Sequence, residues 1–458
     1  MPFYRSLFAL LAAVMLNPIC LGASSFEVPP HRIAASFVPS SFFGSSRHQR
    51  REKSTRSHGW TDIERQLEPA WSAELPLSID AALDTTNPAF SDERPTLFRE
   101  RHGWCPYSER VWLMLEVGNV AYDEIRIDNT GGVRPSYFGG QTPQMRWPGQ
   151  SRPQGESMDL VNKLDQEYCG GVFQSADDRV QSVVSQFRNI FPRARPSSRA
   201  AFLFQYNGEP LWKSTFAETL EKTDLLLSQT VGPFFCGNAL TVADIAWAPF
   251  LERYRYQLPC LHAGLLPDDA SIYPHLAAWY QAMDEKVPAY ACRVKGDASS
   301  WRKVLTMAGF GNAGLPPDVS ATMKDRIAVE LEQADAIVNS ASWKDYASTR
   351  PFLASNPAAQ AALVITRNRK AIVADLLKRK SANLPSDESD AEAALESLAQ
   401  LLLGNIHVQD LQSSVRKTVG ASASFLDERM CVPRDMGAMS AASIKKLSLE
   451  LRTDWRSH

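Results

Sequence analysis

The chain has 458 residues, with 49 Lys and Arg against 51 Asp and Glu, which gives a formal net charge of −2. This balance argues against nucleic-acid binding over the whole chain, and the length allows two or three domains with ordinary cores. The seven cysteines and eight histidines show no paired or clustered spacing, so the sequence predicts neither a disulfide scaffold nor a metal site.

The N-terminal region has the composition of targeting segments. A basic residue precedes an apolar run at 7–16 that is too short to span a bilayer, and small residues follow, which predicts a secretory signal peptide over residues 1–25. Residues 26–58 are rich in Ser and Arg and poor in acid, which is typical of a transit peptide. With Phe26 at the junction, the arrangement resembles the bipartite plastid signals of algae with secondary plastids. We therefore expect plastid delivery, and the alternative is a disordered tail on a protein of the secretory pathway.

The middle of the chain predicts one small α/β domain. Apolar residues show no clear helical or strand period over 59–94, and this segment is interpreted as a lead-in to the first domain. The elements expected next are a strand at 96–100, a helix at 109–117, a strand at 121–127, two short strands around the turn at 148–149 and a helix at 155–168. This β-α-β, β-β-α order with short connections predicts a single domain over 95–170.

The remainder is predicted to be helical. Residues 171–299 predict an all-helical domain, in which Thr241 and Asp244 have the spacing of a capping box. Residues 300–458 predict a helical extension of unknown role, without a recognisable set of catalytic side chains. Cys431, in a loop of this extension, is interpreted as a buried packing residue.

Cys105, in the stretch RERHGWCPYSERVWLML, is the candidate reactive residue of the chain. It stands where the predicted strand ends and a helix begins, and the free N–H groups and dipole of a helix start favour an anion, which predicts a lowered pKa for the thiol. Ser108 occupies the place of a second cysteine, so a mixed disulfide on Cys105 would need a thiol from solution. Taken alone, a single cysteine at a helix start is more often a packing residue.

Two later segments complete the pattern. Thr142 and Pro143 enter a strand, where a proline cannot donate to the ladder; this indicates either a special turn, such as one with a cis bond, or an edge strand. Glu156 and Ser157 open a helix whose N-terminus could bind a carboxylate, or they are simply cap residues. The order of the three features in a β-α-β-β-β-α frame is more specific than any of them alone.

This pattern resembles the glutathione S-transferase family, in its cysteine-dependent lambda and dehydroascorbate-reductase classes. The resemblance rests on CPYSERVW, RPSYF, GESMDLVNKLD, GPFFCGNALTVADIAWAPFLERY and YPHLAAWYQAMDEKVPAY, and covers about residues 95 to 295. It implies the fold class α/β plus all-α: an N-terminal thioredoxin-like βαβ-ββα domain, an all-helical transferase C-terminal domain at 171–299 and the helical extension at 300–458.

The resemblance also implies roles for the site residues. Cys105 would be the nucleophile that forms a mixed disulfide with glutathione. Thr142, beside a cis Pro143, would bind the cysteinyl part of glutathione, and Glu156 and Ser157 would bind its γ-glutamyl end. The implied activity is that of a glutathione-dependent thiol transferase or reductase, through deglutathionylation or dehydroascorbate-type reduction.

Glutathione would then be the co-substrate and a small electrophile or disulfide the second substrate. We expect no metal, no nucleic acid and no membrane span in the mature protein, and a homodimer is one option. A conventional conjugating transferase is disfavoured by the cysteine. The main alternative is a non-catalytic binding or scaffold protein of the same fold that works through its helical extension.

Overall fold

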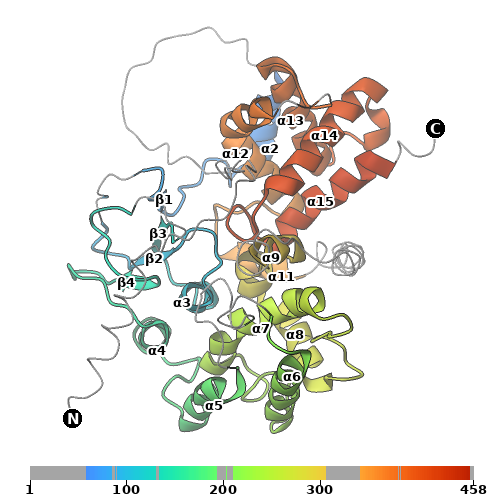
Figure 1. Cartoon of the computed structure of the whole chain (residues 1–458). Helices are drawn as coiled ribbons and strands as arrows, with labels where there is room; N and C mark the ends of the chain where they lie inside the picture. Colours follow the sequence, from blue (N-terminus) through green and yellow to red (C-terminus); the bar gives the residue numbers. More distant parts are fainter. Residues whose placement is uncertain are drawn as a thin grey trace, which may run out of the picture. The chain divides into compact units, whose positions relative to one another are not determined.

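The computed structural model describes residues 58–84, 88, 90–129, 134–192, 203, 210–305, 341–379, 381 and 383–453. The predicted signal peptide at 1–25 and all but the last residue of the transit segment at 26–58 lie outside the described residues. Within these ranges the elements are α2 (His58–Gln66), β1 (Ser78–Asp80), β2 (Thr96–Glu100), α3 (Pro106–Val117), β3 (Asp123–Ile127), β4 (Gln144–Arg146), α4 (Ser157–Tyr168), α5 (Asp178–Ile190), α6 (Lys213–Ser228), α7 (Val242–Leu261), α8 (Pro274–Lys286), η1 (Tyr290–Val294), α9 (Ala298–Leu305), α11 (Ala341–Ser348), α12 (Pro357–Lys378), α13 (Glu388–Leu402), η4 (Val408–Asp410), α14 (Ser413–Arg429) and α15 (Ala438–Thr453) (Figure 1). None of the helices in this described part is long and apolar enough to cross a bilayer.

The four strands form one sheet in the order β1-β3-β2-β4. β1 and β2 both run parallel to β3, whereas β4 runs antiparallel to β2. The parallel pair β2–β3 is joined through α3, as a crossover connection requires, and α4 follows β4. The predicted thioredoxin-like α/β fold followed by an all-helical part is therefore confirmed. The second short strand expected after the turn is instead a single bridge between Met145 and Gln154.

The two faces of the sheet bury different side chains. On one face, Phe98, Ile125 and Ile127 pack with Phe138 in a small core of their own. On the other face, Leu97 belongs to the large core that contains α3 and α4. α3 contacts both α4 and α7, and ten of its twelve residues are buried. This helix is therefore buried on nearly every side, which places its N-terminus at the junction of the sheet and the helical part.

α7 is the central helix of the helical part and is buried over most of its length. It begins with the predicted capping box: the backbone N–H of Thr241 donates to Oδ2 of Asp244 at 2.9 Å. The other oxygen of Asp244 accepts from the indole of Trp279 at 2.9 Å and from the backbone N–H of Phe235 at 3.0 Å. One buried carboxylate thus joins the start of α7 to α8 and to the preceding loop.

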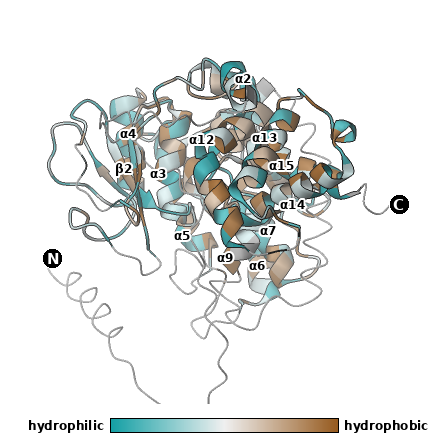
Figure 2. Cartoon of the chain, turned by 90° about the horizontal axis from the view of Figure 1, so that it is seen from above, coloured by the Kyte–Doolittle hydropathy of each residue, from teal (hydrophilic) through white to brown (hydrophobic). Residues whose placement is uncertain are grey.

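The C-terminal extension has a separate core built from α12, α13, α14 and α15. Figure 2 shows both apolar and polar positions along these helices, as expected for helices with one buried face. The same core contains Trp60, Ile63, Leu67 and Ala70, and α2 contacts α12 and α13. Residues 59–94, interpreted from the sequence as a lead-in without regular elements, therefore contribute a helix to the extension and a strand, β1, to the sheet.

Candidate functional site

Cys105 lies at the junction between the sheet and the helical part. It is the N-cap residue of α3, with φ −79° and ψ 112°, and Pro106 opens the helix. The cysteine side chain is only 2% exposed. Its Sγ lies 3.9 Å from the carbonyl oxygen of Thr142, and the peptide bond between Thr142 and Pro143 is cis. The fold therefore brings together the first three predicted site residues.

The protonation of Cys105 differs from the sequence-based expectation. Burial raises the pKa of this thiol above its ordinary value, hydrogen bonds from Ser108 act in the opposite direction, and the nearby Glu100 carboxylate raises it further. The prediction of a lowered pKa was wrong because it counted the helix start and omitted the loss of solvent around the sulfur. A pKa above the ordinary thiol value favours the protonated form of Cys105 at neutral pH.

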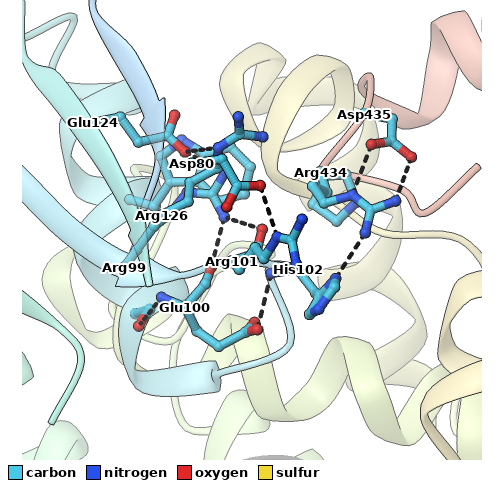
Figure 3. Close-up of polar contacts among 12 residues, drawn as sticks. Asp80, Arg99, Glu100, Arg101, His102, Glu124, Arg126, Arg434 and Asp435 are labelled. Atoms are coloured by element: carbon cyan, nitrogen blue, oxygen red, sulfur yellow. Dashed lines mark hydrogen bonds and ion pairs between the residues drawn. The ribbon is translucent and has the colours of Figure 1, made fainter. Parts of the chain in front are cut away.

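Glu100, at the end of β2, holds the backbone of the loop that leads into Cys105. One oxygen of its carboxylate accepts a hydrogen bond from the backbone N–H of His102 at 2.9 Å (Figure 3). The other oxygen accepts from the backbone N–H of Trp104 at 2.7 Å. The carboxyl group is buried, and burial raises its pKa. Glu100 was not singled out from the sequence, although an acidic residue directly before a turn is a common way to satisfy backbone N–H groups.

The same loop is held from the helical part by Arg253 of α7. The guanidinium donates to the carbonyl oxygens of Trp104, at 3.1 Å, and Gly103, at 3.5 Å. It also forms an ion pair with Glu109 of α3 at 2.6 Å, and both side chains are almost completely buried, at 0% and 2% exposed. Two segments far apart in the sequence therefore set the backbone position of Cys105.

The residues predicted to bind glutathione lie at the entry to β4 and at the start of α4. Hydrogen bonds of 2.8 Å in both directions join the backbones of Met145 and Gln154 and draw these two segments together. Pro143 consequently lies beside Gly155, where an added Cβ would be 3.9 Å from the proline carbonyl oxygen. Glu156 is the N-cap residue of α4, and Ser157 is the first helical residue.

The backbone of Glu156 is unusual. Its φ is 67° and its ψ is 98°, and its side chain is exposed. A positive φ is uncommon for a residue other than glycine and is found disproportionately at functional sites. The positive φ therefore marks Glu156 as a strained position at the start of α4.

The loop before Thr142 contains a cation, Arg134, that was not singled out as a site residue from the sequence. The segment directly before Thr142 reads GGQ, and the exposed side chain of Arg134 contacts it. Its guanidinium donates to the carbonyl oxygen of Gly140 at 2.5 Å and to Oδ1 of Asn129 at 2.8 Å. Nδ2 of Asn129 in turn donates to Oγ1 of Thr142 at 2.7 Å. Arg134 thus places a positive charge near Thr142.

Metal binding has no support in the part of the chain that the structure describes. No group of three or more His, Cys, Asp or Glu side chains there could hold an ion. No disulfide bond joins any two of the six cysteines in the described ranges.

Comparison with known proteins adds an independent observation. The family model described as "Glutathione S-transferase, C-terminal domain" matches residues 178–282. The chain is 28% identical to Protein IN2-1 homolog B of Oryza sativa subsp. indica over 160 residues, which are 33% of this chain and 62% of the relative. It is 27% identical to Glutathione S-transferase L1 of Arabidopsis thaliana over 199 residues, 40% of this chain and 76% of the relative.

Another relative, "Glutathione S-transferase L2, chloroplastic" of Arabidopsis thaliana, is 26% identical over 204 residues, 41% of this chain and 62% of the relative. Among solved structures, glutathione transferase Omega 3C from Trametes versicolor is similar with a TM-score of 0.36 and 15% identity, over 55% of this chain and 96% of that one. The part of this chain that matches Protein IN2-1 homolog B covers less than two thirds of the length of that relative.

Proposed function

Because the chain belongs to the glutathione S-transferase family, we propose that it is a glutathione-dependent thiol transferase or reductase that works through Cys105. The observation that carries this proposal is a single cysteine at the start of α3, with its Sγ 3.9 Å from the carbonyl of Thr142 and a serine where a second cysteine would stand. A cysteine nucleophile becomes covalently attached to the thiol it reacts with, which suits thiol exchange.

The proposed reaction consumes one glutathione for each glutathionylated substrate and releases oxidised glutathione. The Cys105 thiolate attacks the glutathione sulfur of the mixed disulfide, the S–S bond breaks, and the substrate leaves as a thiol after taking up a proton. A second glutathione, as its thiolate, then attacks the sulfur of the glutathionyl group that is bound to Cys105. The disulfide bond to Cys105 breaks, which releases oxidised glutathione and the Cys105 thiolate. The two electrons that reduce the substrate therefore come from glutathione.

Ser108 is the group best placed to stabilise the thiolate that this reaction requires. It is buried, and its hydrogen bonds lower the pKa of Cys105 against the larger effect of burial. Its hydroxyl oxygen also accepts from the backbone N–H of Glu100 at 3.3 Å, so the hydroxyl hydrogen can point to the sulfur. We expect the proton of Cys105 to leave as the glutathione-containing substrate enters.

Glutathione itself would be held across the two segments next to the cysteine. The backbone of Thr142, beside Pro143, would pair with the cysteinyl part. The free N–H groups at the start of α4 and the hydroxyl of Ser157 would bind the γ-glutamyl carboxylate, and the carboxylate of Glu156 would bind its ammonium group. We also propose delivery to a plastid, which agrees with the word "chloroplastic" in the name of one relative.

The test is glutathione-dependent reduction of hydroxyethyl disulfide and of dehydroascorbate by purified protein. Cys105→Ser should lose this activity by about a thousandfold or more while it still binds glutathione, because only the nucleophile is removed. Cys169→Ser is the matched control, since Cys169 is a half-buried thiol whose pKa burial raises to about 11, and it should retain the wild-type rate. Equal activity in the Cys105 variant would refute the proposal, and an inactive wild-type protein that binds glutathione would favour the non-catalytic binding or scaffold alternative.

A further inference from the structure

A loop of the C-terminal extension packs directly on the loop that leads into Cys105. This loop connects α14 to α15. Sγ of its Cys431 lies 3.8 Å from the carbonyl oxygen of His102. A Cβ added to Gly103, whose φ is +79°, would lie 3.4 Å from two ring atoms of Pro433. The positive φ of Gly103 favours glycine, and Pro433 lies within van der Waals contact of the position that a Cβ would occupy.

Arg434 makes the directed contact between the two loops. Its Nη1 lies 2.8 Å from Nδ1 of His102 (Figure 3). The rest of its guanidinium is held in place by Asp435, because Nε and Nη2 each donate to one of the carboxylate oxygens at 2.7 Å. Oδ2 of Asp435 also accepts from the backbone N–H of Cys431 at 2.9 Å. The bidentate contact with Asp435 thus orients the Arg434 guanidinium toward His102.

The loop of the extension is also fastened to the helical part. The backbone N–H of Val432 donates to Oγ of Ser300 at 2.8 Å. Nη1 of Arg293 donates to the carbonyl oxygen of Pro433 at 2.8 Å. These contacts come from α9 and η1, so the loop has a fixed position relative to the helices that surround α3.

His102 is in the protonation state that this contact needs. Burial, together with the positive charge of Arg434, lowers the pKa of His102 to about 3. The imidazole is therefore neutral at physiological pH, and Nδ1 can accept the hydrogen bond from the guanidinium. The ring stacks on Trp104 with a centroid separation of 4.4 Å, and Trp104 is the residue before Cys105. A continuous set of contacts leads from the extension to the cysteine.

We propose that Arg434 is a positioning residue for Cys105: by holding His102, it keeps the loop at 102–104 closed against the start of α3. The extension would then set how accessible the Cys105 sulfur is and how well it is aligned. The catalytic consequence rests on the proposed function, whereas the effect on accessibility does not. Glu100 and Arg253 fix the backbone of this loop, and Arg434 adds a hold on the His102 side chain.

The experiment measures the rate at which iodoacetamide alkylates Cys105, by peptide mass spectrometry, over a range of pH. Arg434→Met removes the donor, and His102→Phe removes the acceptor while it keeps a ring to stack on Trp104 and leaves the pair of Arg434 with Asp435 intact. Both should be alkylated about tenfold faster than wild type, the factor that corresponds to about 1.4 kcal/mol. The midpoint of the pH–rate curve should also move down, toward the ordinary pKa of a thiol, because a loosened loop admits solvent.

Two further variants separate positioning from general destabilisation. His102→Asn keeps an acceptor near the position of Nδ1 for Arg434 and should stay close to wild type. Arg429→Met removes a guanidinium that binds Asp375 at 2.9 and 3.0 Å within the extension and should also leave Cys105 unchanged. An unchanged rate and midpoint in both Arg434→Met and His102→Phe would overturn the proposal, as would an equal increase in Arg429→Met.

The outcomes remain separable from those of the proposed function. A wild-type protein without thiol-transfer activity would refute the proposed function, yet the alkylation rates would still test the positioning role. In an active protein, we expect Arg434→Met to lower kcat for thiol transfer about tenfold with little change in KM for glutathione, because a small misalignment of a nucleophile reduces the rate of the chemical step.

Discussion

Arg253→Met tests how the helical part supports the cysteine loop. Arg253 is 0% exposed and its partner Glu109 is 2% exposed, and they form an ion pair of 2.6 Å. The guanidinium also donates to the carbonyl oxygens of Pro249 and Trp104 and stacks over the ring of Trp301 at 4.1 Å. Methionine preserves much of the apolar stem but leaves the Glu109 carboxyl without its cation.

Removing one partner of a buried ion pair costs about 3–5 kcal/mol of unfolding free energy, because the remaining charge is left uncompensated. The cost should depend on pH. Burial raises the pKa of Glu109 well above its usual range, and Arg253 draws it back. A carboxyl with a raised folded pKa loses stability as pH rises above its unfolded value of about 4.3. Without Arg253 the folded pKa rises further, so the deficit of the variant should grow with pH once the pH exceeds the folded pKa of Glu109 in the wild-type protein. Stability is therefore compared at about pH 5 and about pH 8.

The assay is urea unfolding of wild type and variant at both pH values. Glu109→Gln combined with Arg253→Met should recover part of the loss at the higher pH, because the charge that lacked a partner is gone. Lys222→Met is the control, since Lys222 forms an exposed pair with Glu218 at 2.6 Å and should cost no more than about 0.5 kcal/mol. A deficit below about 1 kcal/mol, or one that shrinks as the pH rises, would refute this reasoning.

Three further predictions concern other parts of the chain. Ile63→Ala should lower the free energy of unfolding by about 2–5 kcal/mol, because Ile63 is 0% exposed in the core of the extension; in thermal and urea melts, a loss no larger than that of Leu83→Ala, at a residue 54% exposed, would contradict it. Glu156→Gly should raise stability by about 1 kcal/mol or less, because it relieves the positive φ; it should also weaken glutathione binding about tenfold in calorimetry, and unchanged binding would count against the assigned role. As pH falls from about 6.5 toward 3, the wild-type protein should lose up to ~1.4 kcal/mol of unfolding free energy per pH unit relative to His102→Gln. The unfolded chain binds a proton that the buried imidazole, with its pKa of about 3, does not, and an equal pH dependence of unfolding free energy in the two proteins would contradict this.

The features that could be predicted from the sequence are those with local signals. Pro106 after Cys105 marks a helix start, and the spacing of Thr241 and Asp244 marks a capping box, which the structure contains. Pro143 could be recognised as unusual because a proline is tolerated at only a few positions of a strand. Each of these signals lies within a few residues of the feature that it predicts.

The features that could not be predicted depend on contacts between distant segments. Arg253 and Arg434 reach the cysteine loop from about 150 and 330 positions further along the chain, and a single sequence gives no information about such pairings. Burial of Cys105 is of the same kind, so its raised pKa was missed. α2 is different: Trp60, Ile63 and Leu67 have helical spacing, but the helix is short and its partners lie at the other end of the chain.

The central claim is covalent one-cysteine chemistry at Cys105, and the most direct measurement is the intact mass of the protein after incubation with oxidised glutathione. Wild type should gain the mass of one glutathione, Cys105→Ser should not, and reduced glutathione should remove the adduct. An unmodified wild-type protein, or an equal adduct on the Cys105→Ser variant, would contradict the account and identify Cys105 as a packing residue at the start of α3.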